Sequence, residues 1–410
     1  MSDWASSSPR DFAEPPVQTA VPATVEKPAW AAVVSLTFGV FGLVTAEFLP
    51  ASLLTPMAAE LGVSNGAAGQ AVTATAVVAA FAGPLLVLGS GRIDRQKIVW
   101  TLSTMLVVSS LLAAFATNIT VLLLARALLG FALGGFWAMA AALALRLVPT
   151  AMVPRAMSII FTGVSVATVF AAPLGAFLSG LWGWRVTFMA AAGIGVVALL
   201  VQLATLPKLP PVAAPGLSSF AIVLKRRSVQ VGLGTVLLVI SGHFAGFTYI
   251  RPFLEQVSGL GIQTISLALL AFGIGGFLGN LAGGVIAEKS ARIAVGSGSL
   301  LLAGAALALI VWGATGSVAF AATALWGFAF GGFPVSISSW NARVAPDQAE
   351  SAGALLATSF QVAIASGAVI GGLLVDGMGP VGVIGYALVV ILAGALLMLV
   401  AGRGREQAPH

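Results

Sequence analysis

The stretch AWAAVVSLTFGVFGLVTAEFLPASLL, residues 29–54, decides the fold of this chain. It is long enough to cross ~30 Å of hydrocarbon as a helix, which takes roughly 20 apolar residues. Its only charged side chain is Glu47. Because a carboxylate at bilayer depth costs roughly 2.5–3.5 kcal/mol on insertion scales, such an acid normally faces a partner or a water-filled path. The stretch predicts a membrane-spanning helix with Glu47 as a candidate functional residue.

Comparable apolar runs fill most of the 410 residues, of which 59% are hydrophobic and 8% charged. This composition excludes an ordinary soluble domain. Runs of spanning length lie at 29–54, 67–91, 98–117, 119–145, 156–181, 186–206, 229–250, 264–287, 293–315, 317–342, 352–375 and 380–402. The sequence therefore predicts an all-α, polytopic membrane protein with 12 transmembrane helices.

The basic residues predict the orientation of these helices. If the N-terminus is cytoplasmic, all but three of the 19 Lys and Arg lie on the cytoplasmic side; the exceptions are Arg126, Arg185 and Arg251. Cytoplasmic loops carry an excess of Lys and Arg, so both termini are expected in the cytoplasm. The net charge of +6 then reflects topology, and no nucleic-acid partner is expected.

A Pro-rich polar break at 207–228 divides the spans into six and six. The predicted organisation is a disordered cytoplasmic tail (1–28), an N-terminal six-helix bundle (29–206), a cytoplasmic linker (207–228), a C-terminal six-helix bundle (229–402) and a cytoplasmic tail (403–410). Duplicated halves of this kind are typical of transporters, whose substrate site lies at the midplane between them. Stripes of small residues, such as Gly130 with Gly134 and Gly327 with Gly331, are interpreted as helix-packing surfaces.

Enzyme and metal chemistry find little support in the sequence. No lysine follows a glycine as a Walker A loop requires, so ATP is not expected as the energy source. Two histidines and no cysteine leave no metal-binding cluster, and no Ser, His and Asp set converges. We expect no catalytic residues, no metal and no cofactor.

Glu47 and Arg126 lie at matching depths. Seven residues separate each from the outer end of its span, which places both ~10 Å below the outer surface at ~1.5 Å per residue. If the two spans are neighbours, Arg126 can hold Glu47 ionised in one state and release it in another. Pro50 cannot donate to the carbonyl of Ala46 and so loosens the helix beside the acid. A permanent structural ion pair is the alternative.

Other candidates lie in later spans. His243 is near the middle of the seventh span, and a free imidazole titrates near pH ~6.5, which suits a proton relay or a hydrogen bond to a polar ligand; a packing role is equally open. Aromatic rings stack on heteroaromatic bases, and amides can bind a base edge or sugar hydroxyls. The candidates of these kinds, for which a core or lipid-facing role is the alternative, are Trp137, Phe247, Phe333, Asn280 and Gln361.

Several motifs resemble those of the major facilitator superfamily. Arg126 to Gly130 followed by Gly134 resembles its fourth-helix motif, whose Arg is associated there with proton transfer. Residues 171–175, with Gly163 upstream, are similar to the fifth-helix motif of proton-coupled antiporters. Gly284 to Lys289 resembles the inter-helix loop motif, with Glu288 replacing the usual Asp. In the copy of this motif in the first half of the chain, Gly91 occupies the position where the family has an acid. The family attributes a conformational latch to that acid, so the latch is in doubt in this half.

Further runs resemble a narrower group, the purine ribonucleoside efflux pumps among the drug:proton antiporters. They read EFLP (47–50), SLLTPM (52–57), GGFWAM (134–139), FTYIRP (247–252) and DQAE (347–350), and the likeness extends over 30–402. It implies the major facilitator fold, two six-helix bundles around a cavity lined by spans one, four, seven and ten. It also implies a monomer in the bacterial inner membrane, surrounded by lipid, that exports purine ribonucleosides such as inosine and guanosine by proton antiport.

The resemblance assigns roles to the candidates. Glu47, Arg126 and His243 would couple protons. Base and ribose would be bound by Trp137, His243, Phe247, Asn280, Phe333 and Gln361. Conformational motifs would comprise Gly163, Pro173, Gly175, Gly284 and Glu288. Proton-coupled efflux of lipophilic drugs or sugars on the same fold stays open as an alternative, as does a membrane sensor that transports nothing.

Overall fold

The computed structural model describes residues 28–89, 93–149, 152–210 and 218–403. The predicted tails, 1–28 and 403–410, lie outside these residues except at their inner ends, and Gly91 lies outside them as well. The helices of the first half are α1 (Trp30–Leu61), α2 (Asn65–Gly89), α3 (Arg95–Ala114), α4 (Ile119–Leu147), α5 (Val153–Trp182) and α6 (Trp184–Thr205). Those that follow are α7 (Ser218–Leu224), α8 (Arg227–Thr248), α9 (Ile250–Gln256), α10 (Ile262–Lys289), α11 (Ala291–Trp312), α12 (Gly316–Val344), the short 3-10 helix η2 (Pro346–Gln348) and α13 (Ala349–Ala401).

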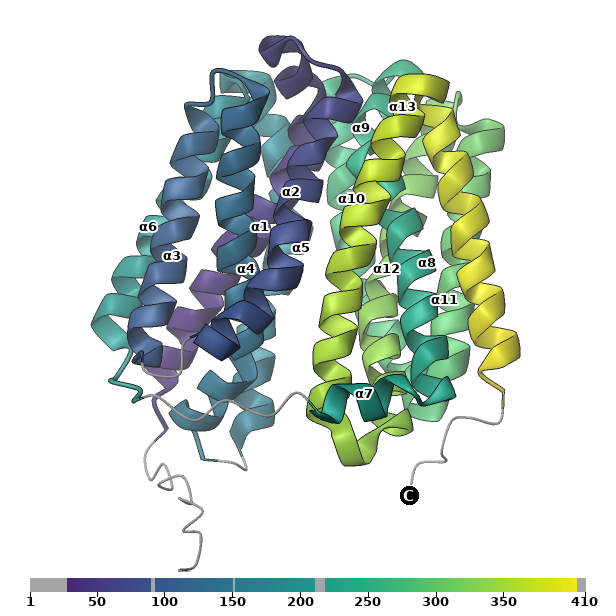
Figure 1. Cartoon of the computed structure of the whole chain (residues 1–410). Coiled ribbons are helices and arrows are strands. Elements are labelled where there is room, and N and C mark those ends of the chain that lie inside the picture. The colour runs from purple at the N-terminus through teal and green to yellow at the C-terminus, as the bar shows by residue number, and fades with distance from the viewer. Residues whose placement is uncertain (1–27, 90–92, 150–151, 211–217, 404–410) are drawn as a thin grey trace, which may run out of the picture.

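The predicted fold is confirmed. In the described part of the chain, 11 helices are long and apolar enough to cross a membrane, and the last of them, Ser351–Ala401, holds two spans. Its backbone leaves the helical region at Gly379 (φ 73°, ψ 178°), and Pro380 follows. A positive φ suits glycine, and proline cannot continue the hydrogen-bond ladder. Figure 1 shows the two arms of α13 meeting at the top, which completes twelve spans.

Most span boundaries shift by a few residues from the predicted ones, and two of the shifts bear on the site. α1 continues seven residues beyond the predicted end at 54 and stops at Gly62, whose left-handed backbone (φ 65°) caps the helix. The predicted span 229–250 ends at Thr248, and α9 follows as a separate short helix. Helix starts follow local chemistry: the side chains of Asp94, Asn118 and Ser290 accept backbone N–H bonds at the starts of α3, α4 and α11.

The helices form two bundles that stand side by side (Figure 1). In the first, α2 packs on α4, α1 on α5 and α3 on α6; in the second, α8 packs on α13 and α10 on α12. The bundles meet where α2 packs on α13 and α5 on α10. We call the end at which α1 begins the terminal end, and the end at which α1 gives way to α2 the opposite end.

Glycine allows equivalent helices in the two halves to approach closely. A Cβ atom on Gly130 of α4 would collide with the carbonyl of Thr75 on α2, and one on Gly331 of α12 would collide with the carbonyl of Gly276 on α10. Backbones this close require small residues. The packing interpretation of the glycine stripes therefore accounts for their contacts in both bundles.

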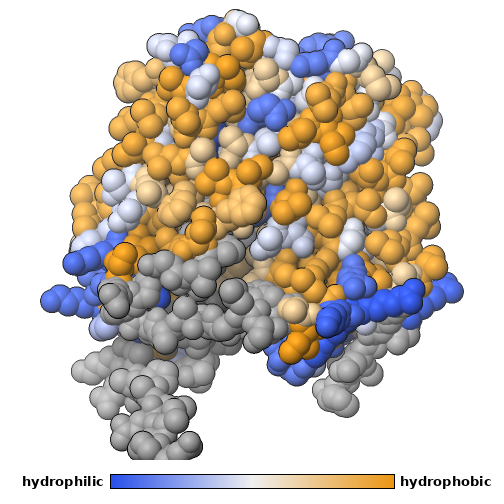
Figure 2. Space-filling view, viewed as in Figure 1, coloured by the Kyte–Doolittle hydropathy of each residue, from blue (hydrophilic) through white to orange (hydrophobic). Residues whose placement is uncertain are grey.

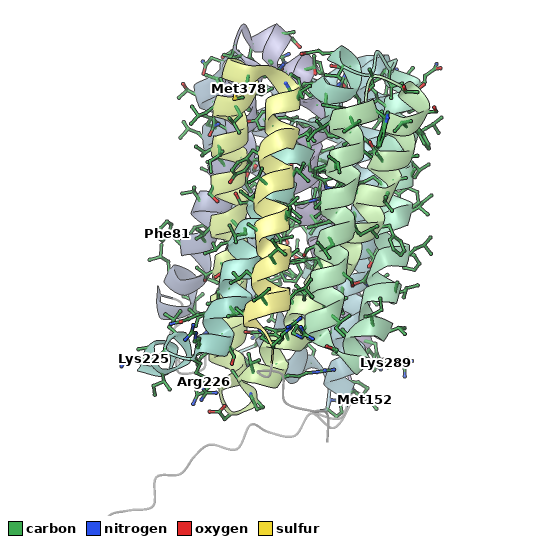
Figure 3. The ribbon with its side chains drawn as sticks, turned by 90° about the vertical axis from the view of Figure 1, so that its right-hand side faces the viewer. Phe81, Met152, Lys225, Arg226, Lys289 and Met378 are labelled. Carbon is green, nitrogen blue, oxygen red and sulfur yellow. The ribbon has the colours of Figure 1, made fainter. Side chains whose placement is uncertain are left out.

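The outer surface matches a bilayer environment. Large apolar side chains such as Phe81, Leu124, Leu373 and Val389 are each about two-thirds exposed or more, and Figure 2 shows apolar residues over most of the height of the helices. Hydrophilic residues gather at the lower edge of that view. Figure 3 places Lys225, Arg226 and Lys289 at the terminal end and Met378 at the opposite end. The chain is thus a multi-pass membrane protein.

Candidate functional site

Arg126 of α4 reaches α1 and α2 through backbone carbonyls. The side chain is 1% exposed. Its Nη1 donates to the carbonyl oxygen of Ala46 (2.7 Å), its Nη2 to that of Glu47 (3.3 Å) and its Nε to that of Ala71 (3.3 Å). Spans one and four are therefore neighbours.

Pro50 explains why Arg126 binds at this point. In a regular helix the carbonyl of Ala46 would accept the N–H of residue 50, which proline lacks. Both α1 prolines, Pro50 and Pro56, lie inside the helix. Arg126 supplies the missing donor, so a buried carbonyl that would otherwise lack a partner is satisfied.

The carboxylate of Glu47 is not part of this hydrogen-bond set. It is half-buried and forms no ion pair or hydrogen bond with another described residue, although its charge interacts with that of Arg126. The guanidinium is turned toward the backbone of α1, so Arg126 and Glu47 form no direct ion pair in this conformation. The carboxylate remains free to exchange a proton or contact a ligand.

His243 lies in an aromatic cluster of the second bundle. The residue is 0% exposed, and its Nδ1 accepts the indole N–H of Trp326 on α12 (2.9 Å). Its ring stacks on Phe330, with centroids 3.4 Å apart and planes within 1°. The Nε2 atom is buried and has no hydrogen-bond partner among the described residues.

Phe247 connects this cluster to the first bundle. Its ring stacks near-parallel to His243 (5.6 Å, 11°) and to Phe272 of α10 (4.7 Å, 25°). It also meets Phe48 of α1 edge to face at 5.9 Å. Phe48 follows Glu47 in the chain, so the cluster contacts α1 one residue away from the acid.

The other predicted substrate residues are more scattered. Trp137 packs against Phe161 of α5 (5.5 Å), and Phe333 is 1% exposed. Asn280 is exposed and forms no hydrogen bond with a described residue, whereas Oε1 of Gln361 is buried without a partner. The structure joins none of these four to the ring contacts of His243.

The predicted conformational motifs lie where helices meet. A Cβ on Gly163 would collide with the carbonyl of Thr37, and one on Gly175 would crowd the hydroxyl of Ser52, so both permit close packing of α5 on α1. Pro173 lies inside α5 between them. Open space surrounds Gly284, and Glu288 has an exposed side chain and a carbonyl that accepts a bond from Arg343 (3.0 Å).

One group of contacts at the opposite end was not predicted. Asp376 of α13 accepts hydrogen bonds from the hydroxyl of Ser64 (2.5 Å) and the N–H of Gly66 (2.9 Å), and so caps the start of α2 in the other bundle. The hydroxyl of Tyr249 lies 3.0 Å from the carbonyl of Ala368 and 3.4 Å from that of Gly66. These bonds hold α2 and α13 together at this end.

A second set joins α9 to α1. Nη1 of Arg251 donates to the carbonyl of Ser52 (2.5 Å), its Nε pairs with Glu255 (2.7 Å), and Glu255 accepts the hydroxyl of Thr55 (2.6 Å). The carbonyl of Ser52 is the one that Pro56 leaves without a helical donor. Only one feature of the sequence could have indicated this contact: Pro56 follows Ser52 by four residues and so leaves its carbonyl without a helical donor.

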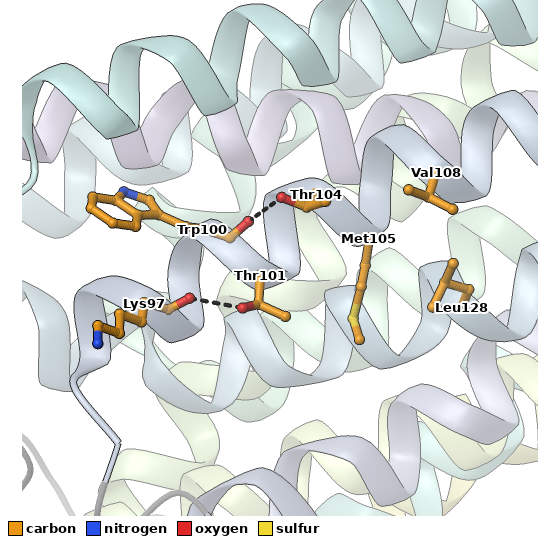
Figure 4. Close-up of a pocket in the computed structure, with 7 residues that line it drawn as sticks. All are labelled: Lys97, Trp100, Thr101, Thr104, Met105, Val108 and Leu128. Carbon is orange, nitrogen blue, oxygen red and sulfur yellow. Dashed lines mark hydrogen bonds between the residues drawn. The ribbon is translucent and has the colours of Figure 1, made fainter.

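The groove of about 480 Å³ shown in Figure 4 lies elsewhere, on α3 and α4. Its lining residues are Lys97, Trp100, Thr101, Thr104, Met105, Val108 and Leu128. The hydroxyls of Thr101 and Thr104 bond to carbonyls of their own helix, so the groove walls present mainly apolar surface.

The candidate site therefore comprises Glu47, Arg126 and the His243 cluster. No group of three or more potential metal ligands occurs among the described residues.

The sequence profile of the Major Facilitator Superfamily matches residues 36–363. The chain is 43% identical over 377 residues to the purine ribonucleoside efflux pump NepI of Salmonella paratyphi C (strain RKS4594), covering 92% of this chain and 94% of the relative, and equally similar to that of Salmonella typhi.

Solved structures share the fold. A bacterial homolog of the human lysosomal transporter Spinster, in an inward-facing and unoccupied conformation, aligns with a TM-score of 0.75 at 16% identity, covering 93% of this chain and 99% of that one. The human organic anion transporter MFSD10 (TETRAN) aligns with a TM-score of 0.63 at 18% identity, covering 90% and 98%.

Proposed function

The chain belongs to the Major Facilitator Superfamily, and from this premise we propose that it exports purine ribonucleosides such as inosine and guanosine in exchange for protons. The high identity to pumps named for that activity, along 92% of the chain, supports the substrate class. The chain works as a monomer in the bacterial inner membrane, with the terminal end in the cytoplasm.

The observation that carries the proton-coupling proposal is the unpaired carboxylate of Glu47. It lies inside a membrane span, beside a guanidinium that is satisfied by backbone carbonyls. An ionised Glu47 is attracted to Arg126 and a protonated Glu47 is not, so proton binding changes how α1 and α4 interact. A permanent ion pair would offer no such change.

The transport cycle follows from where the bundles touch. The hydrogen bonds that Asp376 accepts and Arg251 donates close the opposite end. In this conformation the protein therefore releases a proton to the cytoplasm and takes up nucleoside from it. Opening of the opposite end exposes Glu47 to the outside, where a proton replaces the departing nucleoside. One pH unit supplies about 1.4 kcal/mol per proton, enough for roughly tenfold accumulation.

Everted membrane vesicles test this proposal. Radiolabelled inosine should accumulate in vesicles when the lumen is made acidic, and a protonophore should abolish the accumulation. Uptake by the wild-type protein that ignores the protonophore contradicts antiport. A chain that moves no nucleoside in either direction contradicts the substrate assignment.

A second candidate, efflux of planar lipophilic drugs, is favoured by the His243 cluster, whose ring contacts are all aromatic. Competition assays separate the two. An excess of unlabelled guanosine should suppress inosine uptake, whereas chloramphenicol should not. The reverse pattern assigns the drug role.

A further inference from the structure

Trp326 and His243 form a hydrogen bond that fixes the imidazole tautomer. The indole Nε1–H can only donate, and it lies 2.9 Å from Nδ1 of His243. Nδ1 must therefore present its lone pair, and the proton of the neutral ring lies on Nε2. The two residues are 2% and 0% exposed, so water does not compete for this bond.

The proton on Nε2 is a buried donor without an acceptor. No described residue accepts from it, and the atom is shielded from solvent. A buried polar group that lacks a partner carries its full desolvation cost, and native structures retain few of them. Such a donor in the core of a transporter is accounted for if a ligand supplies the acceptor in another step of the cycle.

The surroundings indicate what kind of ligand that is. The planes of Phe330, Phe247 and Phe272 lie within 1°, 11° and 20° of the imidazole plane. Rings so aligned favour a flat heteroaromatic molecule that stacks in the same orientation. Since Nε2 is covered here, the rings have to part before a ligand can reach it.

We propose that Trp326 is a positioning residue that holds His243 as a hydrogen-bond donor, through Nε2, to an acceptor on the purine base. This rests on the proposed function and identifies the group that selects the base. His243 is then a recognition residue and does not carry the transported proton, because protonation of Nδ1 would break the bond to Trp326. Glu47 carries the transported proton instead.

Transport assays with purine analogues test whether His243 recognises the base. Proteoliposomes containing the full chain are supplied with inosine, with its 3-deaza and 7-deaza analogues, each of which replaces an acceptor ring nitrogen with C–H, and with 6-thioinosine, whose sulfur is a weaker acceptor than the oxygen it replaces. For the wild-type protein, one analogue should show a KM about tenfold higher, the loss expected for one hydrogen bond. His243→Phe should raise the KM for inosine by a similar factor and remove the penalty for that analogue.

The variant Trp326→Phe tests whether Trp326 positions His243. It keeps a ring and removes the N–H, so His243 can populate both tautomers, and KM should rise about threefold while the maximal rate and its pH profile stay unchanged. Trp312→Phe is the matched control, because Trp312 is 58% exposed on α11. A changed pH profile in Trp326→Phe, or equal KM values for all analogues in the wild type, overturns the proposal.

Solid-state NMR of ¹⁵N-histidine-labelled protein reads the tautomer without transport. The chain has two histidines, so few signals overlap. The wild type should show an unprotonated Nδ1 for His243, and Trp326→Phe should show a mixture. A protonated Nδ1 in the wild type contradicts the role of Trp326 even if inosine is transported, whereas absence of inosine transport with the expected tautomer counts against the proposed function alone.

Discussion

Arg126 contacts Glu47 through the backbone: its Nη2 lies 3.3 Å from the carbonyl oxygen of Glu47, and the carboxylate of that residue forms no ion pair within the described chain. The cation is thereby fixed in place without neutralising the acid. A charge held near a titratable group but not in contact with it can respond to protonation while the helix packing stays intact.

Glu47→Gln should uncouple transport from the pH gradient. The amide keeps the size of the side chain but cannot exchange a proton, so gradient-driven inosine accumulation should fall more than tenfold, while exchange of labelled for unlabelled inosine persists. Both are measured in the same proteoliposomes. Glu60→Gln is the control, because Glu60 bonds to Trp184 at the opposite end (2.6 Å); it should retain the gradient response. Accumulation by Glu47→Gln would refute the role of this acid.

Pro50→Ala should stabilise the protein and slow transport. An interior proline costs a helix about 3 kcal/mol relative to alanine, and the new N–H can bond to the carbonyl of Ala46 in competition with Arg126. We expect a higher Tm in detergent and a transport rate several-fold lower. Pro346→Ala, in the exposed helix η2, should change neither. A lower Tm with an unaltered rate would argue against the role given to the Ala46 carbonyl.

The sequence indicated Glu47 and Arg126 as partners only on the condition that spans one and four are neighbours, and it left the atoms that meet undetermined. Matching depth and the uncharged surroundings identify Glu47 and Arg126 as partners. Pro50 marks a free carbonyl on Ala46. Which donor fills it depends on the rotation of α4 about its axis, and the hydropathy pattern of an all-round apolar helix leaves that rotation undetermined.

Contacts between residues far apart in the chain were even harder to predict from the sequence. Trp326 is 83 residues from His243, and Asp376 is 312 residues from Ser64. Neither Trp326 nor Asp376 lies in a local sequence motif that indicates its partner. The break at Gly379 and Pro380, in contrast, is a local backbone property, and the sequence placed a span boundary there correctly.

Asp347→Asn should remove a component of the pH dependence of stability. The two hydrogen bonds from Arg226 (2.5 and 2.6 Å) hold the pKa of Asp347 below its usual value. A carboxylate with a depressed folded pKa contributes stability above its unfolded pKa, near ~3.9, and loses that contribution as pH falls through the folded value.

The wild-type Tm should therefore decline more steeply below about pH 4 than that of Asp347→Asn, and the two curves should run parallel at higher pH. Because the pair is solvent-exposed, high salt should reduce the difference between the proteins. Differential scanning fluorimetry at low and high salt measures this. Identical curves in acid would show that the pair contributes nothing to folding.

Arg251→Gln should open the opposite end. It removes a bond to the carbonyl that Pro56 leaves free and an ion pair with Glu255, so contacts that close this end weaken relative to those at the terminal end. Pro56→Ala should act in the same direction, because residue 56 then offers Ser52 its own N–H.

The chain has no cysteine, so a single Phe48→Cys can report access to the contact between bundles. In intact cells, a membrane-impermeant maleimide should label that cysteine several-fold faster in either variant. Arg185→Gln breaks a contact with Glu60 within one bundle and should leave the labelling rate unchanged; equal acceleration by all three would mean general loosening, not an opened gate.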